Sequence, residues 1–211
     1  MQILPASPQA ITEAIHVLSQ GGIVVHATET CYGIACDLRN PDAVAKLFAV
    51  KNRPDTQLIS ALFSSTNQAR MYVQWTALAE DLARNYLPGP LTIVLPLRPD
   101  APDHLYPLPA TRHPLTLGVR ISSHPLAMQL AKEFSFPVAT TSANVHGRPE
   151  VYAIPALLGQ LGEGCGQPDL IIDSGPLPKK PPSTVVEVVG EEWKVLRKGS
   201  IDTASRLKLH Q

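Results

Sequence analysis

The sequence predicts an α/β fold, or a closely related α+β fold, in which helices flank one mixed parallel and antiparallel sheet. Short apolar runs that suit buried strands alternate along the chain with segments whose apolar residues recur at helical spacing. Near the C-terminal end, two strand-like runs are separated by Gly190-Glu191, which is typical of a β-hairpin. Because a hairpin is antiparallel, we expect a mixed sheet and not a purely doubly wound one.

The first helix begins at Ser7-Pro8, a favourable N-cap and first helical position, and ends at Gly21-Gly22. The apolar run that follows predicts a buried strand leading into a polar loop. The second helix begins at Asn40, and it ends before Pro54 because the residue preceding a proline avoids the helical conformation. The further elements predicted in this half are strands over 23–27, 58–63 and 91–95, a polar loop over 28–33, and a helix over 77–87.

The second half of the chain repeats this alternation of strands and helices. A helix begins at Ser123 or His124, with Pro125 near its first turn. A strand directly before Ser142 places this serine and Asn144 at the strand's carboxyl end. The elements predicted here are strands over 116–121, 137–141, 170–173, 183–189 and 193–196, and helices over 124–134 and 154–161.

Composition limits the classes of protein that this chain can belong to. Its 211 residues allow one large domain or two small ones, and the 44% of them that are hydrophobic are enough to form a core. A formal net charge of zero argues against a dedicated nucleic-acid binder. Three cysteines without a C-x-x-C pair suggest free thiols, and no apolar run reaches the ~20 residues of a membrane span. We therefore expect a cytoplasmic protein that does not enter the membrane.

Two cations follow the second predicted helix and could bind a phosphate. Lys51 and Arg53 lie in its last turn, where both side chains could point at one anion and form charge-assisted hydrogen bonds. On position alone, the simpler interpretation is that they stabilise the negative end of the helix dipole. The pair becomes a phosphate site only if other polar groups face it.

Ser142 and Asn144 are the partners that such a site would need. They follow a predicted strand, and ligands of open α/β sheets bind at the carboxyl ends of strands. A turn or N-cap pair is the ordinary alternative. A serine hydrolase is less favoured, because no G-x-S-x-G surrounds Ser142. A Cys31–His26 nucleophile is also less favoured, and the scattered His and Cys residues predict no metal site.

Arg120 is a charged residue inside an otherwise apolar predicted strand. Burying a guanidinium without a partner is costly, so a carboxylate is required nearby. An internal Asp or Glu and the carboxylate of a bound amino acid are equally good candidates.

Taken in order, several motifs of the chain resemble those of the YrdC-type threonylcarbamoyl-AMP synthases. The resemblance covers about residues 8 to 201, and the order of the motifs makes it specific although each one alone is weak. The motifs are Gly21-Gly22, Ala27-Thr28-Glu29-Thr30-Cys31-Tyr32-Gly33, Lys51-Asn52-Arg53-Pro54, Pro88-Gly89-Pro90-Leu91-Thr92, Arg120-Ile121-Ser122, Ser142-Ala143-Asn144-Val145-His146-Gly147, Ser183-Thr184-Val185 and Leu196-Arg197-Lys198-Gly199.

This resemblance implies a twisted mixed sheet with a concave groove, in a protein of the single-domain type, with one domain over residues 1–211. It also implies that ATP, L-threonine and bicarbonate or CO₂ react to give threonylcarbamoyl-AMP and pyrophosphate, with Mg²⁺ accompanying the nucleotide. The adenylate would pass to a separate tRNA threonylcarbamoyl transferase complex, and a contact with tRNA is possible. Positioning and charge neutralisation can carry most of such a reaction without a protein nucleophile.

The resemblance also implies roles for individual residues. Lys51 and Arg53 are the expected catalytic cations. The residues expected to bind ATP are Lys51, Arg53, Gln57, Thr116, Ser142, Asn144 and Arg197. The residues expected to bind L-threonine are Thr30, Arg120, Thr140 and Ser183.

The chain departs from the family pattern at several positions. Ala27 replaces the usual proline, and no proline follows Arg120-Ile121. Gln57 stands where a lysine or asparagine is common, so we expect it to hydrogen-bond a phosphate without adding charge. Glu150 replaces a common serine or threonine. The alternatives are a non-catalytic or altered-substrate relative that binds nucleotide or RNA, and a carbamoyl-handling module like that of hydrogenase-maturation carbamoyltransferases.

Overall fold

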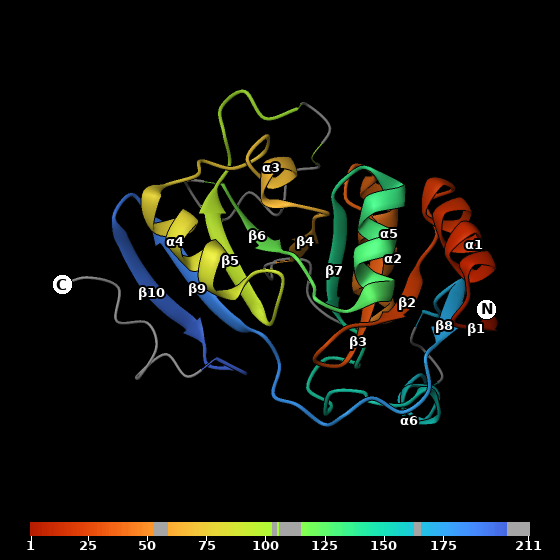
Figure 1. Ribbon diagram of the computed structural model, residues 1–211. Coiled ribbons are helices and arrows are strands. Elements are labelled where there is room, and N and C mark those ends of the chain that lie inside the picture. Colours follow the sequence, from red (N-terminus) through yellow and green to blue (C-terminus); the bar gives the residue numbers. More distant parts are fainter. Residues whose placement is uncertain (53–58, 103–104, 106–114, 163–165, 202–211) are drawn as a thin grey trace.

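The computed structural model describes residues 1–52, 59–102, 105, 115–162 and 166–201. In these residues, ten strands form one twisted sheet in the order β1-β8-β2-β3-β7-β4-β6-β5-β9-β10, with helices packed against it (Figure 1). The strands are β1 (Gln2–Pro5), β2 (Val24–Ala27), β3 (Tyr32–Asp37), β4 (Ser60–Leu62), β5 (Leu91–Pro96), β6 (Thr116–Arg120), β7 (Val138–Ser142), β8 (Leu170–Asp173), β9 (Thr184–Val189) and β10 (Glu192–Arg197). The helices are α1 (Pro8–Ser19), α2 (Pro41–Val50), α3 (Thr66–Ala69), α4 (Ala77–Tyr86), α5 (Pro125–Phe134) and α6 (Ile154–Leu158).

The sheet is mixed, as the sequence predicts. Four strand pairs are parallel, namely β1–β8, β2–β8, β4–β6 and β5–β9. The pairs β2–β3, β3–β7, β4–β7, β5–β6 and β9–β10 are antiparallel. The predicted hairpin is confirmed, and Gly190 at its turn has φ +62°, a left-handed conformation that glycine adopts without strain.

The predicted helix starts are confirmed by their caps. Ser7 is the N-cap of α1, and its hydroxyl accepts a hydrogen bond from the backbone N–H of Ala10. Asn40 caps α2 through its side-chain carbonyl, which accepts from the N–H groups of Asp42 and Ala43. Where the sequence left two candidates for the start of α5, the structure assigns His124 as the N-cap.

Two strands and one short helix were absent from the sequence-based prediction. Tyr32 and Gly33, predicted as the end of a loop, begin the fully buried strand β3. Its Gly, Ala and Cys residues give neither a long apolar run nor an apolar–polar alternation, so the strand has no clear signal. The other omissions are the mostly exposed edge strand β1 and the four-residue helix α3. Such short, exposed elements also carry little hydrophobic pattern.

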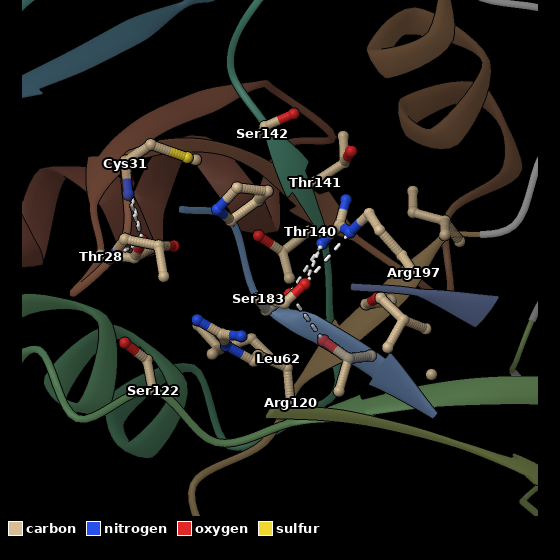
Figure 2. Close-up of a pocket in the computed structure, with 18 of the residues that line it drawn as sticks. Thr28, Cys31, Leu62, Arg120, Ser122, Thr140, Thr141, Ser142, Ser183 and Arg197 are labelled. Atoms are coloured by element: carbon tan, nitrogen blue, oxygen red, sulfur yellow. Dashed lines mark hydrogen bonds between the residues drawn. The ribbon is translucent and has the colours of Figure 1, made fainter. Parts of the chain in front are cut away.

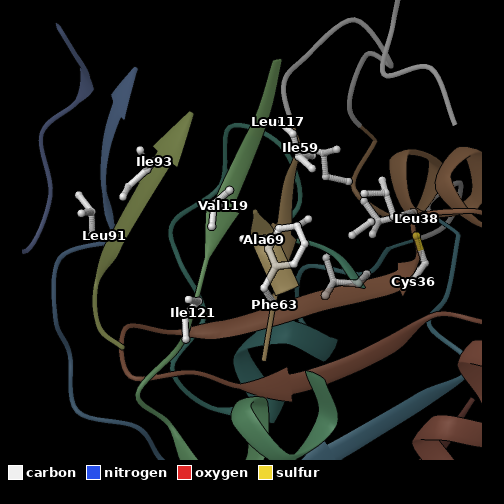
Figure 3. Packing of buried hydrophobic residues seen from close by; sticks show 14 of the residues in the cluster. Cys36, Leu38, Ile59, Phe63, Ala69, Leu91, Ile93, Leu117, Val119 and Ile121 are labelled. Atoms are coloured by element: carbon white, nitrogen blue, oxygen red, sulfur yellow. The ribbon is translucent and has the colours of Figure 1, made fainter. Parts of the chain in front are cut away.

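The sheet has two faces with different coverings. Helices α2 and α4 pack on one face and form the larger core, together with residues such as Phe63, Val119 and Ile121 (Figure 3). On the opposite face, α1 and α5 pack against β2, β3, β7 and β8. That second apolar cluster contains no residue of β5, β6 or β9. The helices α1 and α5 therefore do not cover this part of the face. None of the described helices is both long and apolar enough to cross a membrane.

Candidate functional site

A pocket lies on the part of the sheet that the helices α1 and α5 leave uncovered. Side chains alternate along β6, so that Leu117 and Val119 enter the core while Gly118 and Arg120 line the pocket. The same alternation turns Thr92 and Val94 of β5 toward the pocket. Hydroxyl groups and a guanidinium therefore lie on one face of strands whose other face packs in the core.

The pocket brings together residues that are far apart in the sequence. Among the residues predicted to bind substrate, Thr30, Arg120, Thr140, Ser142, Ser183 and Arg197 all line it (Figure 2). They come from the loop after β2, from β6, from β7 and from the chain segments at β9 and β10. Its enclosed volume is about 190 Å³, and the open space at its mouth brings the total to about 960 Å³.

Arg120 has an internal partner. Its Nη2 donates to the Oε1 of Glu29, and the other carboxylate oxygen of Glu29 accepts from the hydroxyl of Ser122. Burial lowers the pKa of the Arg120 guanidinium, and the charge of Glu29 opposes this lowering. The internal salt bridge left open by the sequence is therefore present.

The salt bridge does not use the whole guanidinium. The Nη1 of Arg120 is buried and has no hydrogen-bond partner among the described residues. A buried donor without a partner is costly, and such groups concentrate where a ligand completes the hydrogen bonding. Of the two partners that the sequence left open for Arg120, the internal carboxylate takes Nη2, and Nη1 is the terminal nitrogen left for a second partner.

Arg197 and Ser183 form a second polar group at the pocket. Arg197 donates through Nε and Nη2 to the backbone carbonyl of Ser183, at 3.1 and 2.9 Å, and Nη2 also reaches the Ser183 hydroxyl at 2.8 Å (Figure 2). The Ser183 hydroxyl lies 3.2 Å from that of Thr92. Ser183, directly before β9, and Arg197, at the end of β10, thus bring a hydroxyl and a cation to the pocket, joined by these hydrogen bonds.

Lys51 is the C-cap residue of α2, and its buried side chain reaches the loop after β7. Its ammonium donates to the backbone carbonyls of Ser142 and of Asn144, the latter at 2.7 Å. The Lys51 carbonyl in turn accepts from the N–H of His146 at 2.8 Å. The predicted proximity of this cation to Ser142 and Asn144 is therefore present, and Lys51 ties their loop to the end of α2.

Two further predicted residues carry polar atoms without partners. The Oγ1 of Thr116 and the Oδ1 of Asn144 are buried, and neither has a hydrogen-bond partner in the described part of the chain. The Asn144 Nδ2 donates to the carbonyls of Arg148 and Val145, at 2.6 and 3.2 Å, which fixes the side chain in its loop. Arg53 and Gln57, predicted to bind phosphate, lie outside the described residues.

A Cys31–His26 nucleophile receives no support from the structure. Burial raises the pKa of the Cys31 thiol, so the reactive thiolate is disfavoured. Burial also lowers the pKa of His26 to about 4, and its Nδ1 lies 3.1 Å from the carbonyl oxygen of Ala27. In the part of the chain that is described, no group of three His, Cys, Asp or Glu residues is placed to hold a metal ion.

Four residues that shape this site, Glu29, Thr92, Gly118 and Ser122, have no role that the sequence predicts. Glu29, Thr92 and Ser122 lie inside the family motifs, but nothing local indicates which side chains they meet. Gly118 lines the pocket. A Cβ at this position would lie 2.9 Å from the Ser60 Oγ and 3.1 Å from the Thr92 Cγ2, so the wall has little room for a side chain here. The parity of positions 118 and 120 in the predicted strand could have placed Gly118 beside Arg120.

The chain matches the sequence profile of a known family over most of its length. The profile, Sua5_yciO_yrdC with the description "Telomere recombination", aligns with residues 16–199. A Photobacterium profundum protein named threonylcarbamoyl-AMP synthase is 32% identical over 157 residues, which are 72% of this chain and 82% of that protein.

Solved structures give the same picture. P. abyssi Sua5 complexed with L-threonine superposes with a TM-score of 0.80 at 27% identity, covering 94% of this chain. The chain spans only 56% of that longer protein. E. coli YciO also superposes with a TM-score of 0.80, at 25% identity and with 96% of both chains covered.

Proposed function

The chain belongs to the Sua5/YciO/YrdC family, and from this membership we propose that it is a threonylcarbamoyl-AMP synthase. It would condense L-threonine, bicarbonate or CO₂, and ATP into threonylcarbamoyl-AMP and pyrophosphate. One observation carries the proposal beyond the family name. A buried arginine with one unpartnered donor nitrogen lines a pocket whose wall also carries several hydroxyl groups.

Arg120 is the proposed anchor for the threonine carboxylate. Its Nη1, which is buried and has no partner among the described residues, is proposed to form a charge-assisted hydrogen bond there, where water competes weakly. The hydroxyls of Thr30 and Ser183 stand on the same pocket and can contact the polar groups of the amino acid. Thr140 of β7 also lines it and would contribute through its backbone.

The nucleotide is proposed to lie toward the carboxyl end of β7. Ser142 lines the pocket there, and Arg197 approaches from the hairpin with a fixed positive charge. Thr116 and Asn144 are not among the residues that line the pocket, and their buried, unpartnered oxygen atoms are proposed to accept hydrogen bonds from ribose or base. Lys51 would neutralise phosphate charge or hold the loop that does so, and Arg53 and Gln57 are proposed to add contacts.

The chemistry needs positioned substrates more than a protein nucleophile. The threonine ammonium loses one proton to water, and the resulting amine forms an N–C bond with CO₂ as one C–O π bond breaks; a second proton then leaves the nitrogen to give the carbamate. A carbamate oxygen then attacks the α-phosphorus of ATP, and the bond to pyrophosphate breaks. Fixed cations stabilise the negative charge that develops on the phosphate oxygens, which is the usual source of catalysis in phosphoryl transfer.

Magnesium is proposed as a companion of the triphosphate. The pocket wall offers hydroxyls and guanidinium groups, and the carboxylate of Glu29 beside it uses both oxygens on Arg120 and Ser122. Mg²⁺ is commonly held by substrate phosphates and water with few protein ligands. We further propose that the product is used in the cytoplasm by a separate tRNA threonylcarbamoyl transferase complex.

The direct test is incubation with ATP, L-threonine and labelled bicarbonate, followed by chromatography for a labelled adenylate. We expect a labelled product that depends on all three substrates, together with pyrophosphate. Absence of product, combined with tRNA binding that weakens steeply with salt, would instead favour a non-catalytic RNA-binding relative.

A pair of lysine variants on one helix sharpens the test. Lys51→Met removes the ammonium that touches the loop of Ser142 and Asn144, whereas Lys46→Met alters an exposed lysine of α2. We expect pyrophosphate release to fall roughly 10²-fold in Lys51→Met, because stabilisation of the transition state is lost. The Lys46 variant should keep normal turnover, and equal rates in both would remove Lys51 from the site.

A further inference from the structure

The contacts of Glu29 form a continuous chain from a helix to the pocket. Glu29 stands in the loop between β2 and β3, while Arg120 ends β6 and Ser122 follows it by two residues. The Ser122 hydroxyl donates to Glu29 and accepts from the backbone N–H of His124 at 3.2 Å. His124 is the N-cap of α5. The carboxylate is thus held at one oxygen by a group fixed to a helix, and at the other it holds Arg120.

This group is buried and its geometry is asymmetric. The side chains of Arg120 and Glu29 are 8% and 12% exposed, so each charge needs the other when the pocket is empty. Yet only one terminal nitrogen of the guanidinium is used, while Nη1 is left without a partner in the described structure. An ion pair that served stability alone would gain more by satisfying both nitrogens.

Arg120 and Ser122 line the pocket (Figure 2). Glu29 is not among the residues that line it. Both carboxylate oxygens of Glu29 already accept hydrogen bonds. Glu29 is therefore badly placed to contact a substrate and well placed to fix the plane of the guanidinium. Fixing that plane determines the direction in which Nη1 points.

We propose that Glu29 is a positioning residue that orients Arg120, so that Nη1 meets the carboxylate of the amino-acid substrate. The inference rests on the proposed function, because it takes an amino acid as the ligand of Arg120. It assigns amino-acid selectivity to a contact between Glu29 and Arg120 that lies behind the pocket wall. The preference for a free carboxylate over a neutral amide is then set by a residue that the substrate does not touch.

The variant Glu29→Gln tests this directly. The amide keeps the shape and one acceptor oxygen, but it loses the charge, and its NH₂ group meets a serine hydroxyl that now donates to the carboxylate. We expect the affinity for L-threonine to fall at least about tenfold, because truncating a buried charge pair disturbs the remaining charge. The affinity for L-threoninamide, which has no carboxylate, should change by less than about twofold.

The measurement is calorimetric titration of the full chain with L-threonine and with L-threoninamide, and the result is the ratio of their dissociation constants. A positioning role predicts that the wild type prefers threonine and that Glu29→Gln loses this preference. Glu29→Asp keeps the charge and should recover part of it. Equal weakening of both ligands in Glu29→Gln, or an unchanged ratio, would overturn the inference.

Two further results keep the outcome decisive. Circular dichroism melting shows whether Glu29→Gln is folded; if it is not, Ser122→Ala removes only one of the two contacts of Glu29 and should lower the same ratio. A ratio that is unchanged in a folded Ser122→Ala would then count against the inference. If the wild type binds threonine normally and the variants do too, only the inference fails. If the wild type binds neither ligand, the proposed function fails and the inference with it.

Discussion

Arg120 shows at the level of one residue why arginine and lysine differ. The guanidinium donates through Nη2 to Glu29, while Nη1 has no partner among the described residues. A single ammonium on a flexible stem is poorly suited to contact Glu29 and a ligand carboxylate at the same time. For Arg120→Lys we expect L-threonine affinity to fall by more than about tenfold, or ~1.4 kcal/mol, with ATP affinity nearly unchanged. Separate titrations with each ligand check this. An equal loss for both ligands would indicate general damage to the pocket.

His26 should make the stability of the protein depend on pH. Burial lowers its pKa from 6.5 to about 4 in the folded state. Above pH 6.5 both states are neutral here and the residue contributes no pH dependence. Between pH 6.5 and 4 the unfolded chain binds a proton at His26 that the folded chain excludes. As the pH is lowered through this window, we therefore expect the free energy of unfolding to fall by about 1.4 kcal/mol per pH unit. Below pH 4 this slope vanishes.

Urea unfolding at several pH values measures that slope. His26→Gln removes the titrating group at the same position, so the part of the slope due to His26 should disappear whatever the variant's absolute stability. Curves with the same slope in wild type and variant would assign the acid sensitivity to other groups.

At the level of elements, the pocket depends on how closely β4, β5 and β6 approach. Gly118 of β6 pairs with Ser60 of β4 and with Val94 of β5. In Gly118→Ala the new methyl group would stand 2.9 Å from the Ser60 Oγ, closer than van der Waals contact allows. We expect a loss of stability of about 1–3 kcal/mol and weaker binding of ligands, because the serine must move toward the pocket.

Gly162→Ala is the matched control for that change. A Cβ at Gly162 meets nothing within 4 Å, so the same substitution should leave both unfolding and ligand binding nearly unchanged. Thermal melting and threonine titration of the two variants compare the effects. A Gly118 variant as stable and active as the control would show that β4 and β5 adjust without cost.

At the level of the whole molecule, binding should couple the separate parts of the sheet. The pocket takes residues from β5, β6, β7 and the β9–β10 hairpin, so a ligand bound there contacts segments far apart in the chain. A ligand at 100 times its dissociation constant stabilises the folded state by about 2.7 kcal/mol. For a chain of 211 residues we expect Tm to rise by roughly 5–10 °C with saturating L-threonine or ATP.

Differential scanning fluorimetry with each ligand alone and with both measures this shift. D-threonine is the control, because it has the same charges but the opposite configuration and should give a smaller rise. A similar rise with both enantiomers would point to a charge effect rather than a shaped site.

Local sequence signals are enough to predict where several helices begin and where the C-terminal hairpin turns. Capping residues such as Ser7 and Asn40 mark helix starts, and Gly190 with its flanking runs marks the hairpin, because these signals act over a few neighbouring residues. The conflict of a charge inside an apolar strand likewise singled out Arg120. The order of short motifs indicated the family.

Which distant residues come into contact depends on the tertiary structure. Glu29 and Arg120 are 91 residues apart, and their contact depends on the order of strands in the sheet, which no local pattern contains. The same holds for the ammonium of Lys51, whose partners on the loop after β7 lie 91 and 93 residues away. Strand β3 became visible only through its neighbours, because burial between β2 and β7 holds its small residues in place. The pairing of distant strands depends on the free energy of the whole packed sheet. For this reason local patterns in the sequence identify the charged residues of the site but not the residues that they contact.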